Sequence, residues 1–162
     1  MPVDIAIRQL FSSFVNRLRN SGHGPPLIRV DFPIIELDGS RNGVEGLWCI
    51  RRGDSLFEID NIPFAVREVS LGYLVECHWN GNSWVFHKVI KKSCYCCARV
   101  YAESSIDLNL WKCIIENLDI KYEFASGQRV GVAAVPTDMM TLVERISELD
   151  EVLVEVTATV GE

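Results

Sequence analysis

Apolar and polar residues alternate with a period of two through much of the stretch from residue 27 to residue 91. This pattern is typical of β-strands with one buried face, because successive side chains of a strand point to opposite sides. Strands are predicted at residues 27–32, 44–50, 56–59, 73–79 and 84–91, with a loop at 38–43. Five short strands predict a small, bent antiparallel β-sheet or a partial barrel.

The last two of these strands form the clearest hairpin, since the turn residues Asn80-Gly81-Asn82-Ser83 join them. A two-residue turn and a longer loop both fit, and in either register one face is apolar and the other polar. The apolar face is predicted to hold Val75, Cys77, Trp79, Trp84 and Phe86, and the polar face Glu76, His78 and His87. Trp79 and Trp84 lie at the tip, where tryptophan is suited to anchor a protein partner.

From residue 98 the hydrophobic period switches between two and 3.6 residues. Strands are predicted at 98–103, 121–125, 130–135 and 152–160. One helix is predicted from a Ser104 or Ser105 cap to Leu118, and a second begins at Pro136 with Leu142 and Ile146 facing inward. The order strand–helix–strand–strand–helix–strand predicts an α+β, ferredoxin-like βαββαβ sandwich.

Residues 4–19 are predicted to form an amphipathic helix that ends before the Gly/Pro-rich stretch 21–26. Its apolar stripe is explained by packing on the body of the protein or on a partner. The predicted organisation is therefore an N-terminal helix and loop (1–26), a β-rich domain (27–97) and a ferredoxin-like domain (98–162). No Gly/Pro linker separates the last two near residues 93–99, so they are expected to dock rigidly.

The most distinctive stretch is Glu58-Ile59-Asp60-Asn61-Ile62-Pro63-Phe64. Asp and Asn favour turns through side-chain bonds to nearby backbone, and proline fixes its own φ while pushing the preceding residue toward extended geometry. Because predicted strands lie on both sides, we interpret this stretch as a fixed elbow in a β structure. A structural turn explains it without any chemistry.

The elbow and its surroundings resemble a bacterial family, domain of unknown function 4265. The matching residues are Glu45, Leu47-Trp48, Asp60-Asn61-Ile62-Pro63-Phe64, Leu71-Gly72, Val75, Ser93 and Arg99-Val100. The resemblance covers roughly residues 28–160. The family usually has Asp after the glycine and His before the arginine, whereas this chain has Tyr73 and the run Ser93-Cys94-Tyr95. The family has no assigned reaction, so the resemblance implies a fold more than a function.

Charge is distributed unevenly along the 162 residues. Residues 1–97 carry 11 Lys/Arg and 10 Asp/Glu, a net charge of +1, whereas residues 98–162 carry 5 and 12, a net charge of −7. An acidic half of this kind argues against nucleic-acid binding and favours a basic partner protein. It also serves solubility in many proteins.

Six cysteines lie mostly within apolar patterns, and a disulfide framework is typical of small secreted chains instead. Cys94-Tyr95-Cys96-Cys97 invites a zinc interpretation, but the sequence has no second Cys knuckle or His pair at metal-ligand spacing. We therefore expect reduced thiols, no metal and no cofactor. Charged residues interrupt the N-terminal stretch, and no apolar run is long enough to span a bilayer, so a cytoplasmic location is expected.

No phosphate-binding loop, nucleophile elbow or paired metal motif occurs in the sequence, so we expect a protein that is not an enzyme. The leading hypothesis is an immunity protein that neutralises a cognate bacterial toxin domain by covering its active site. The alternative is a small-molecule sensor or modifying enzyme that uses the groove between the two halves. Partner-binding residues are predicted on the acidic edge and at the hairpin tip: Glu144, Glu148, Asp150, Glu151, Trp79 and Trp84.

Overall fold

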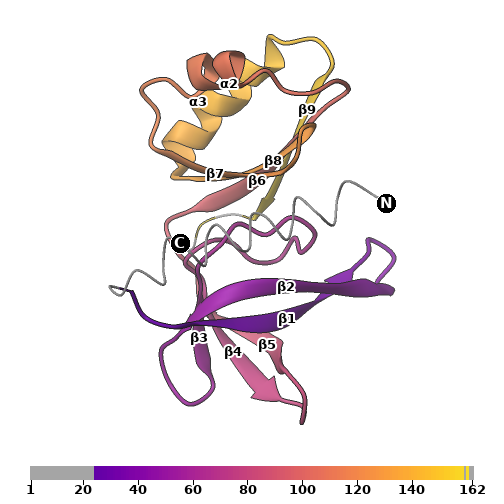
Figure 1. The fold of residues 1–162 in the computed structure, drawn as a ribbon, viewed down its shortest axis with the longest axis vertical. Helices are drawn as coiled ribbons and strands as arrows, with labels where there is room; N and C mark the ends of the chain where they lie inside the picture. The colour runs from indigo at the N-terminus through magenta and orange to yellow at the C-terminus, as the bar shows by residue number, and fades with distance from the viewer. Residues whose placement is uncertain (1–23, 159, 161–162) are drawn as a thin grey trace.

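The computed structural model of this chain describes residues 24–158 and residue 160. The helix predicted at residues 4–19 lies outside the described residues. Within them the fold is mixed α+β and rich in strands, with a closed barrel of five strands and a second sheet of four strands carrying two helices. Figure 1 shows the barrel in the lower half of the molecule, and the second sheet and its helices above it.

The barrel contains β1 (Leu27–Ile35), β2 (Arg41–Arg51), β3 (Leu56–Ile59), β4 (Leu74–Trp79) and β5 (Trp84–Lys91). Consecutive strands pair antiparallel, and β1 and β5 close the ring by a short parallel pairing. The predicted bent sheet is therefore a complete barrel. Its interior is filled by apolar side chains that include Val30, Phe32, Leu47, Phe57 and Val75.

The β1–β2 hairpin is longer than predicted, because residues 41–43 belong to β2 and not to a loop. The turn is confined to residues 36–40, where the Gly39 amide donates to the Glu36 carbonyl and the Ser40 amide donates to Asp38. The sequence pattern misses this extension because most of these residues are exposed and lack the alternation that burial imposes.

The β4–β5 hairpin has the predicted distribution of faces. Val75 and Cys77 are buried, and Phe86 stacks on Phe32 with ring centroids 4.9 Å apart. The turn is the longer of the two alternatives, because Trp79 pairs with Trp84 and residues 80–83 are left as the loop. Within this loop the Asn80 side chain accepts from the Asn82 and Ser83 amides.

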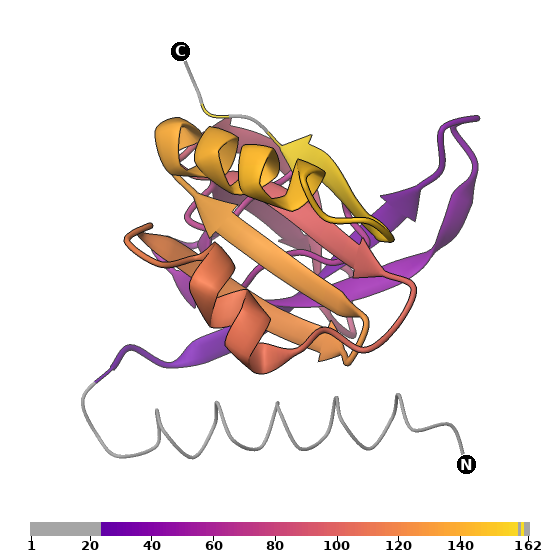
Figure 2. The same cartoon turned by 90° about the horizontal axis from the view of Figure 1, so that it is seen from above.

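The second unit contains β6 (Cys96–Ala102), α2 (Leu108–Ile114), β7 (Ile120–Ser126), β8 (Arg129–Ala134), α3 (Pro136–Ser147) and β9 (Val152–Ala158). Its strands lie in the order β7-β8-β6-β9, and all three neighbouring pairs are antiparallel. In Figure 2 both helices cover the face of this sheet that is turned away from the barrel. Trp111 of α2 and Leu142 and Ile146 of α3 are buried against it.

Helix α2 is shorter than predicted, and neither Ser104 nor Ser105 is its N-cap. The cap is Asp107, whose Oδ1 accepts from the Asn109 amide at 2.7 Å and the Leu110 amide at 3.0 Å. The preceding loop is held elsewhere, since the Ile106 amide donates to the Gly127 carbonyl. After Ile114 the chain leaves the helix, and Arg145 of α3 donates to the freed carbonyls of Ile114 and Glu116.

The elbow lies between the two units. Ile62 and Leu71 from the barrel side form a small buried cluster with Cys97, Ala133 and Ala158 of the second sheet. Gly131 of β8 allows this close approach: a Cβ atom at that position would lie 2.9 Å from both Ile62 and Phe64. The barrel and the second unit are thus joined by packed side chains.

Candidate functional site

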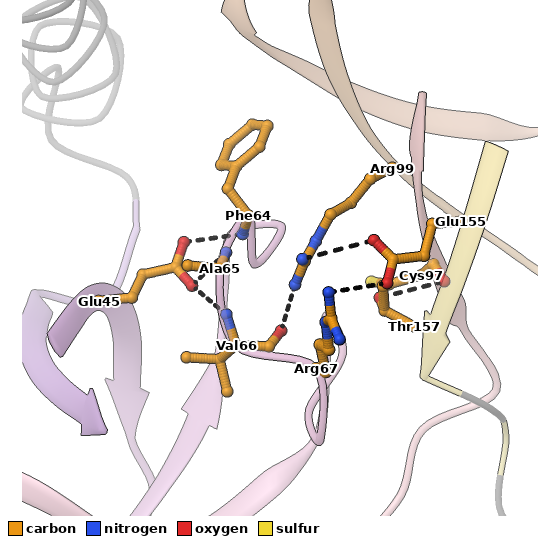
Figure 3. A network of polar contacts seen from close by, with 9 residues as sticks. All are labelled: Glu45, Phe64, Ala65, Val66, Arg67, Cys97, Arg99, Glu155 and Thr157. Carbon is orange, nitrogen blue, oxygen red and sulfur yellow. Dashed lines mark hydrogen bonds and ion pairs between the residues drawn. The ribbon is translucent and has the colours of Figure 1, made fainter. Parts of the chain in front are cut away.

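Several of the residues that carry the family resemblance contact the elbow, while Leu47, Val75 and Val100 lie in the hydrophobic cores of the two units. Glu45 of β2 places both carboxylate oxygens against the backbone of residues 64–66, as Figure 3 shows. Oε1 accepts from the Phe64 amide at 2.7 Å, and Oε2 accepts from the Ala65 and Val66 amides at 2.9 and 2.8 Å. Three backbone donors on one carboxylate fix the chain immediately after Pro63, where no strand pairs with it.

Two further side-chain hydrogen bonds hold the elbow at Asn61 and Ile62, just before Pro63. The Asn61 Oδ1 accepts from the Trp48 amide at 2.8 Å, which ties the turn to β2. Glu123 of β7 accepts from the Ile62 amide at 3.2 Å, so the second unit also contributes to the conformation of the elbow. The Asn61 side chain therefore binds backbone 13 positions away, and not the nearby backbone that its residue type suggested.

Arg99 of β6 lies at the centre of the junction and is only 6% exposed. Its Nη2 donates to the Val66 carbonyl at 3.1 Å, and its Nη1 lies 3.8 Å from Glu155 of β9. Arg67 reaches the other oxygen of Glu155 at 3.1 Å, so two guanidinium groups share one carboxylate (Figure 3). The network connects the elbow to β6 and β9, so Arg99 is a structural link between the two units.

The thiols near this network are poorly suited to nucleophilic chemistry. Burial raises the pKa of Cys97, whose Sγ lies 2.9 Å from the Ser70 hydroxyl, and burial also raises the pKa of Cys96. Cys77 points into the barrel, where burial raises its pKa to about 12, while His87 is exposed. A protonated thiol is a weak nucleophile and a weak metal ligand.

Within the described residues, no group of three or more His, Cys, Asp or Glu side chains is arranged to hold a metal ion. All six cysteines are free, and Cys94 and Cys113 are the exposed ones. Neither described helix is long and apolar enough to cross a lipid bilayer. Two expectations from the sequence stay predictions: that the protein has no cofactor, and that it is not an enzyme.

An open apolar groove of about 470 Å³ runs between α3 and the edge strand β9. Met140, 65% exposed, and Val156, 50% exposed, lie on its surface. Glu144 is its charged wall residue. The full lining is Cys96, Pro136, Met139, Met140, Val143, Glu144, Val156 and Val160. We call this feature the α3–β9 groove.

A second cavity, of about 290 Å³, lies where α2, the end of α3 and the start of β9 meet. Its walls include Val100, Ile106, Trp111 and Ile146, and Asp150 and Glu151 line it as well. We call this feature the α2–α3 cavity. Both the groove and this cavity lie within the second unit.

The structure separates the six predicted partner-binding residues into four places. Glu144 is on the groove wall, while Asp150 and Glu151 line the α2–α3 cavity. Glu148 is exposed at the C-cap of α3. Trp79 ends β4 and Trp84 begins β5, two strands of the barrel, which lies below the second unit in Figure 1.

The two tryptophans also differ from each other. Trp79 is 54% exposed, whereas Trp84 packs on the barrel core with its ring 4.9 Å from that of Phe57. The Arg51 guanidinium lies 5.3 Å from the centre of the Trp84 ring. Trp84 is thus mainly a structural residue, and Trp79 is the exposed member of the pair.

Sequence reasoning missed the apolar residues that accompany Glu144. Met140 follows the inward-facing Met139, and a periodicity argument assigns it to solvent without showing that it adjoins other exposed apolar groups. Val156, 50% exposed, lies in a strand that was predicted only by its alternation. The available signal was the spacing of Val152, Val154 and Val156, which puts these three side chains on one face of the strand.

Comparison with solved structures shows where this fold recurs. A hypothetical protein from Neisseria gonorrhoeae, described as a novel crystal structure, aligns with a TM-score of 0.71 and 17% sequence identity. The alignment covers 86% of this chain and all of that one, and it supports the fold alone. A search of curated proteins gives no match.

A family model matches residues 45–155, from the elbow-binding carboxylate Glu45 to the shared carboxylate Glu155. This range contains the residues whose side chains bind the backbone at or next to the elbow: Glu45, Asn61 and Arg99. The chain belongs to the family whose description is domain of unknown function, DUF4265.

Proposed function

We propose that this chain is a non-catalytic, protein-binding inhibitor that acts in the cytoplasm. Its most specific form is an immunity protein that neutralises a cognate bacterial toxin domain by covering its active site. The proposal is carried by the α3–β9 groove, in which exposed apolar side chains adjoin a carboxylate on one accessible face.

The groove offers what a protein interface requires. Met140 and Val156 supply apolar surface that loses contact with water when a partner covers it. Methionine is flexible and adapts to the shape of a partner side chain. Strand β9 is also the edge of its sheet, so a partner can approach the groove from that side.

Charge indicates the kind of partner. Residues 98–162, which build this unit, carry 12 acidic and 5 basic residues. Glu144 and Glu148 are both exposed on α3 and four residues apart, so they project from the same side of the helix. A basic partner surface is favoured, and enzymes that act on nucleic acids or nucleotides have such active sites.

We also propose that the second unit is a ferredoxin-like sandwich. The element order β6-α2-β7-β8-α3-β9 and the strand order β7-β8-β6-β9 support this assignment. The fold hosts many functions, so the groove and its residues carry the functional argument.

The alternative of a ligand site between the two halves has less support. The junction is occupied by Ile62, Leu71, Cys97, Ala133 and Ala158, which pack as one buried cluster. Glu45 and Arg99 are likewise engaged with backbone groups of residues 64–66.

The experiment is affinity capture of partners from the native cell with the tagged full chain and with its M140D variant. We expect one basic protein to be retained by the wild type and lost from M140D, because a buried carboxylate replaces an apolar contact. L37D is the matched control, since Leu37 is 92% exposed in the β1–β2 turn of the barrel.

The captured protein is then assayed for its own activity with and without the wild-type chain. Loss of that activity at stoichiometric binding supports an inhibitor. A partner that M140D retains as well as the wild type does, or one whose activity is unaffected by binding, contradicts the proposal. The capture is repeated with the W79A variant. If M140D retains the partner and W79A loses it, the interface lies at the barrel tip instead.

A further inference from the structure

One edge of the second sheet leaves backbone groups without a neighbouring strand. β9 ends the strand order β7-β8-β6-β9 and pairs with β6 alone among the described strands. In an antiparallel pair, residues that exchange both backbone hydrogen bonds with the partner strand alternate with residues whose N–H and C=O point the other way. The phase of the pairing with β6 therefore determines which residues of β9 point outward.

That phase follows from Ala102, which lies opposite Val152. The Ala102 amide donates at 3.0 Å to the carbonyl of Gln128, just before β8, so it points away from β9. Val152 is therefore of the outward-pointing kind, and so is Val154, two positions further on. The N–H and C=O groups of both valines face the open edge of the sheet, where no described strand lies.

The features that usually protect an edge strand are missing here. Soluble proteins cover such a strand or place lysine or proline on it, because its unpaired backbone groups attract other chains. β9 reads Val-Leu-Val-Glu-Val-Thr-Ala, and its bulge comes only after Val156. Its charged residue, Glu155, is engaged by Arg67 and Arg99. The opposite edge strand, β7, carries the exposed Lys121.

The α3–β9 groove lies beside this open edge. Val152 and Val154 pack on the core of the second unit, and Val156, on the same face of β9, lines the groove. A strand added next to β9 continues the pleat, so its alternate side chains project on this face, beside Met140 and Glu144. Apolar and basic side chains are complementary to these two groove residues.

We propose that β9 receives an extended segment of the basic partner as a fifth, antiparallel strand of the sheet. The backbone of this segment bonds to Val152 and Val154, and its apolar and basic side chains at alternate positions enter the α3–β9 groove. Strand addition to an open sheet edge is a common mode of binding extended peptides. This inference rests on the proposed function, because the segment belongs to the partner proposed there.

Charge favours a basic segment over a second copy of this chain. Pairing β9 with the β9 of another copy would bring together two units that each carry 12 acidic and 5 basic residues. The exposed Glu144 and Glu148 of both copies would add to this repulsion. The same charges attract a basic segment.

The test uses the ¹⁵N-labelled full chain and the peptide acetyl-TVTRTVTK-amide, which as a strand has Val, Arg, Val and Lys on one face. In an antiparallel pairing, the residues that enter the groove also point their N–H groups toward β9. N-methylation of both valines therefore removes donors to β9, whereas N-methylation of the two threonines that flank the arginine removes donors that point outward. A fourth peptide, with Glu in place of Arg and Lys, tests the charge.

We expect the unmodified peptide to slow hydrogen exchange at the Val152 and Val154 amides about tenfold or more, because each amide gains a hydrogen-bond partner. The peptide with methylated threonines should have the same effect, whereas the peptide with methylated valines and the Glu peptide should not. M140D should weaken binding of the unmodified peptide, and the control L37D, at an exposed residue of the barrel, should not.

Three results would overturn the proposal. The first is unchanged exchange at the Val152 and Val154 amides with the unmodified peptide at about 1 mM. The second is equal binding of the two methylated peptides, or of the Glu peptide and the unmodified one. The third is a homodimer of the full chain in sedimentation whose Val152 and Val154 amides are already protected without peptide, since a second copy would then occupy the edge.

The same exchange measurement on the complex with the captured partner separates this inference from the proposed function. A partner that is inhibited and is lost from M140D, yet leaves the Val152 and Val154 amides unprotected, binds the groove without strand addition and overturns this inference alone. If the peptides behave as expected but no captured protein is inhibited, the proposed function fails while the strand-binding edge stands.

Discussion

At the scale of single residues, long-range contacts determine the conformation of the elbow. Pro63 restricts its own φ and the geometry of Ile62, but the three amides that follow need an acceptor. Glu45, 19 to 21 positions earlier in the chain, supplies both of its oxygens to them. A rigid corner therefore results from a local restraint and one distant carboxylate.

Glu45→Gln tests this arrangement. Glutamine keeps one acceptor oxygen and places an NH₂ group where the second carboxylate oxygen of Glu45 accepted. At least one backbone amide of residues 64–66 therefore loses its hydrogen-bond partner. We expect the free energy of unfolding in urea to fall by about 1–3 kcal/mol. Glu68→Gln, at an exposed site, should change it by less than about 0.5 kcal/mol. Equal effects of the two variants would mean that Glu45 does not hold the elbow.

Gly131 is a second residue whose role comes from packing. A Cβ atom there would lie 2.9 Å from Ile62 Cγ2 and from Phe64 Cε1, closer than carbon atoms normally approach. We expect Gly131→Ala to destabilise the protein by about 1–3 kcal/mol through overpacking of the junction. In Gly53→Ala the new methyl group meets Leu56 at an ordinary 3.4 Å, so thermal melts of the two variants provide the comparison.

At the scale of elements, the hydrophobic period predicts that a helix or strand exists better than it predicts where that element begins and ends. The bounds of β3 and β5 match the sequence prediction because each lies between clear turn residues. Helix α2 was predicted too long at both ends, since Ser104, Ser105 and Asp107 are all plausible caps by residue type. Only contacts with Gly127 and Arg145, both distant in sequence, decide where the helix begins and ends.

The cap of α2 makes its stability depend on pH. Hydrogen bonds from the Leu110 and Asn109 amides hold the pKa of Asp107 below its usual value. A depressed folded-state pKa means that the carboxylate stabilises the helix above the unfolded-state pKa, near 3.9, and that this contribution is lost as pH falls through the folded-state value.

We therefore expect amide-exchange protection in α2 to decrease more than that in α3 when the pH is lowered from 5 to 3. Asp107→Asn keeps a capping oxygen and removes the titration, so its α2 protection should lose that extra pH dependence. The wild type and the variant are compared by hydrogen exchange at matched intrinsic rates. The same extra loss in both would show that another group controls the helix.

At the scale of the whole molecule, the sequence predicted the two kinds of sheet but not how they combine. Alternation identified five strands in the first half, whereas the parallel pairing of β1 with β5 that closes the barrel joins segments more than 50 residues apart. The candidate interface shows the same limit. Glu144 was predicted from helix geometry, while its neighbour Val156 comes from β9 and reaches the groove only through tertiary packing.

Tertiary packing also separates residues that sequence reasoning grouped together. The acidic side chains of α3 and the tryptophans of the β4–β5 tip belong to different units, so one small interface does not need both. Met140 and Val156 replace the tryptophans as the apolar anchor next to Glu144. An acidic edge with its own apolar surface suits fast association with a basic partner, followed by burial of the groove.

The double variant Glu144→Lys/Glu148→Lys tests the electrostatic part of this mechanism. Both side chains are exposed, so the fold should be retained, while the local charge changes by four units. We expect the association rate with the captured basic partner to fall about tenfold or more at low salt, and its salt dependence to weaken or reverse. Lys112→Glu on α2 is a charge-reversal control on a different helix, also at an exposed site. Stopped-flow association at several ionic strengths makes the measurement, and an unchanged rate at low salt in the double variant would remove this edge of α3 from the interface.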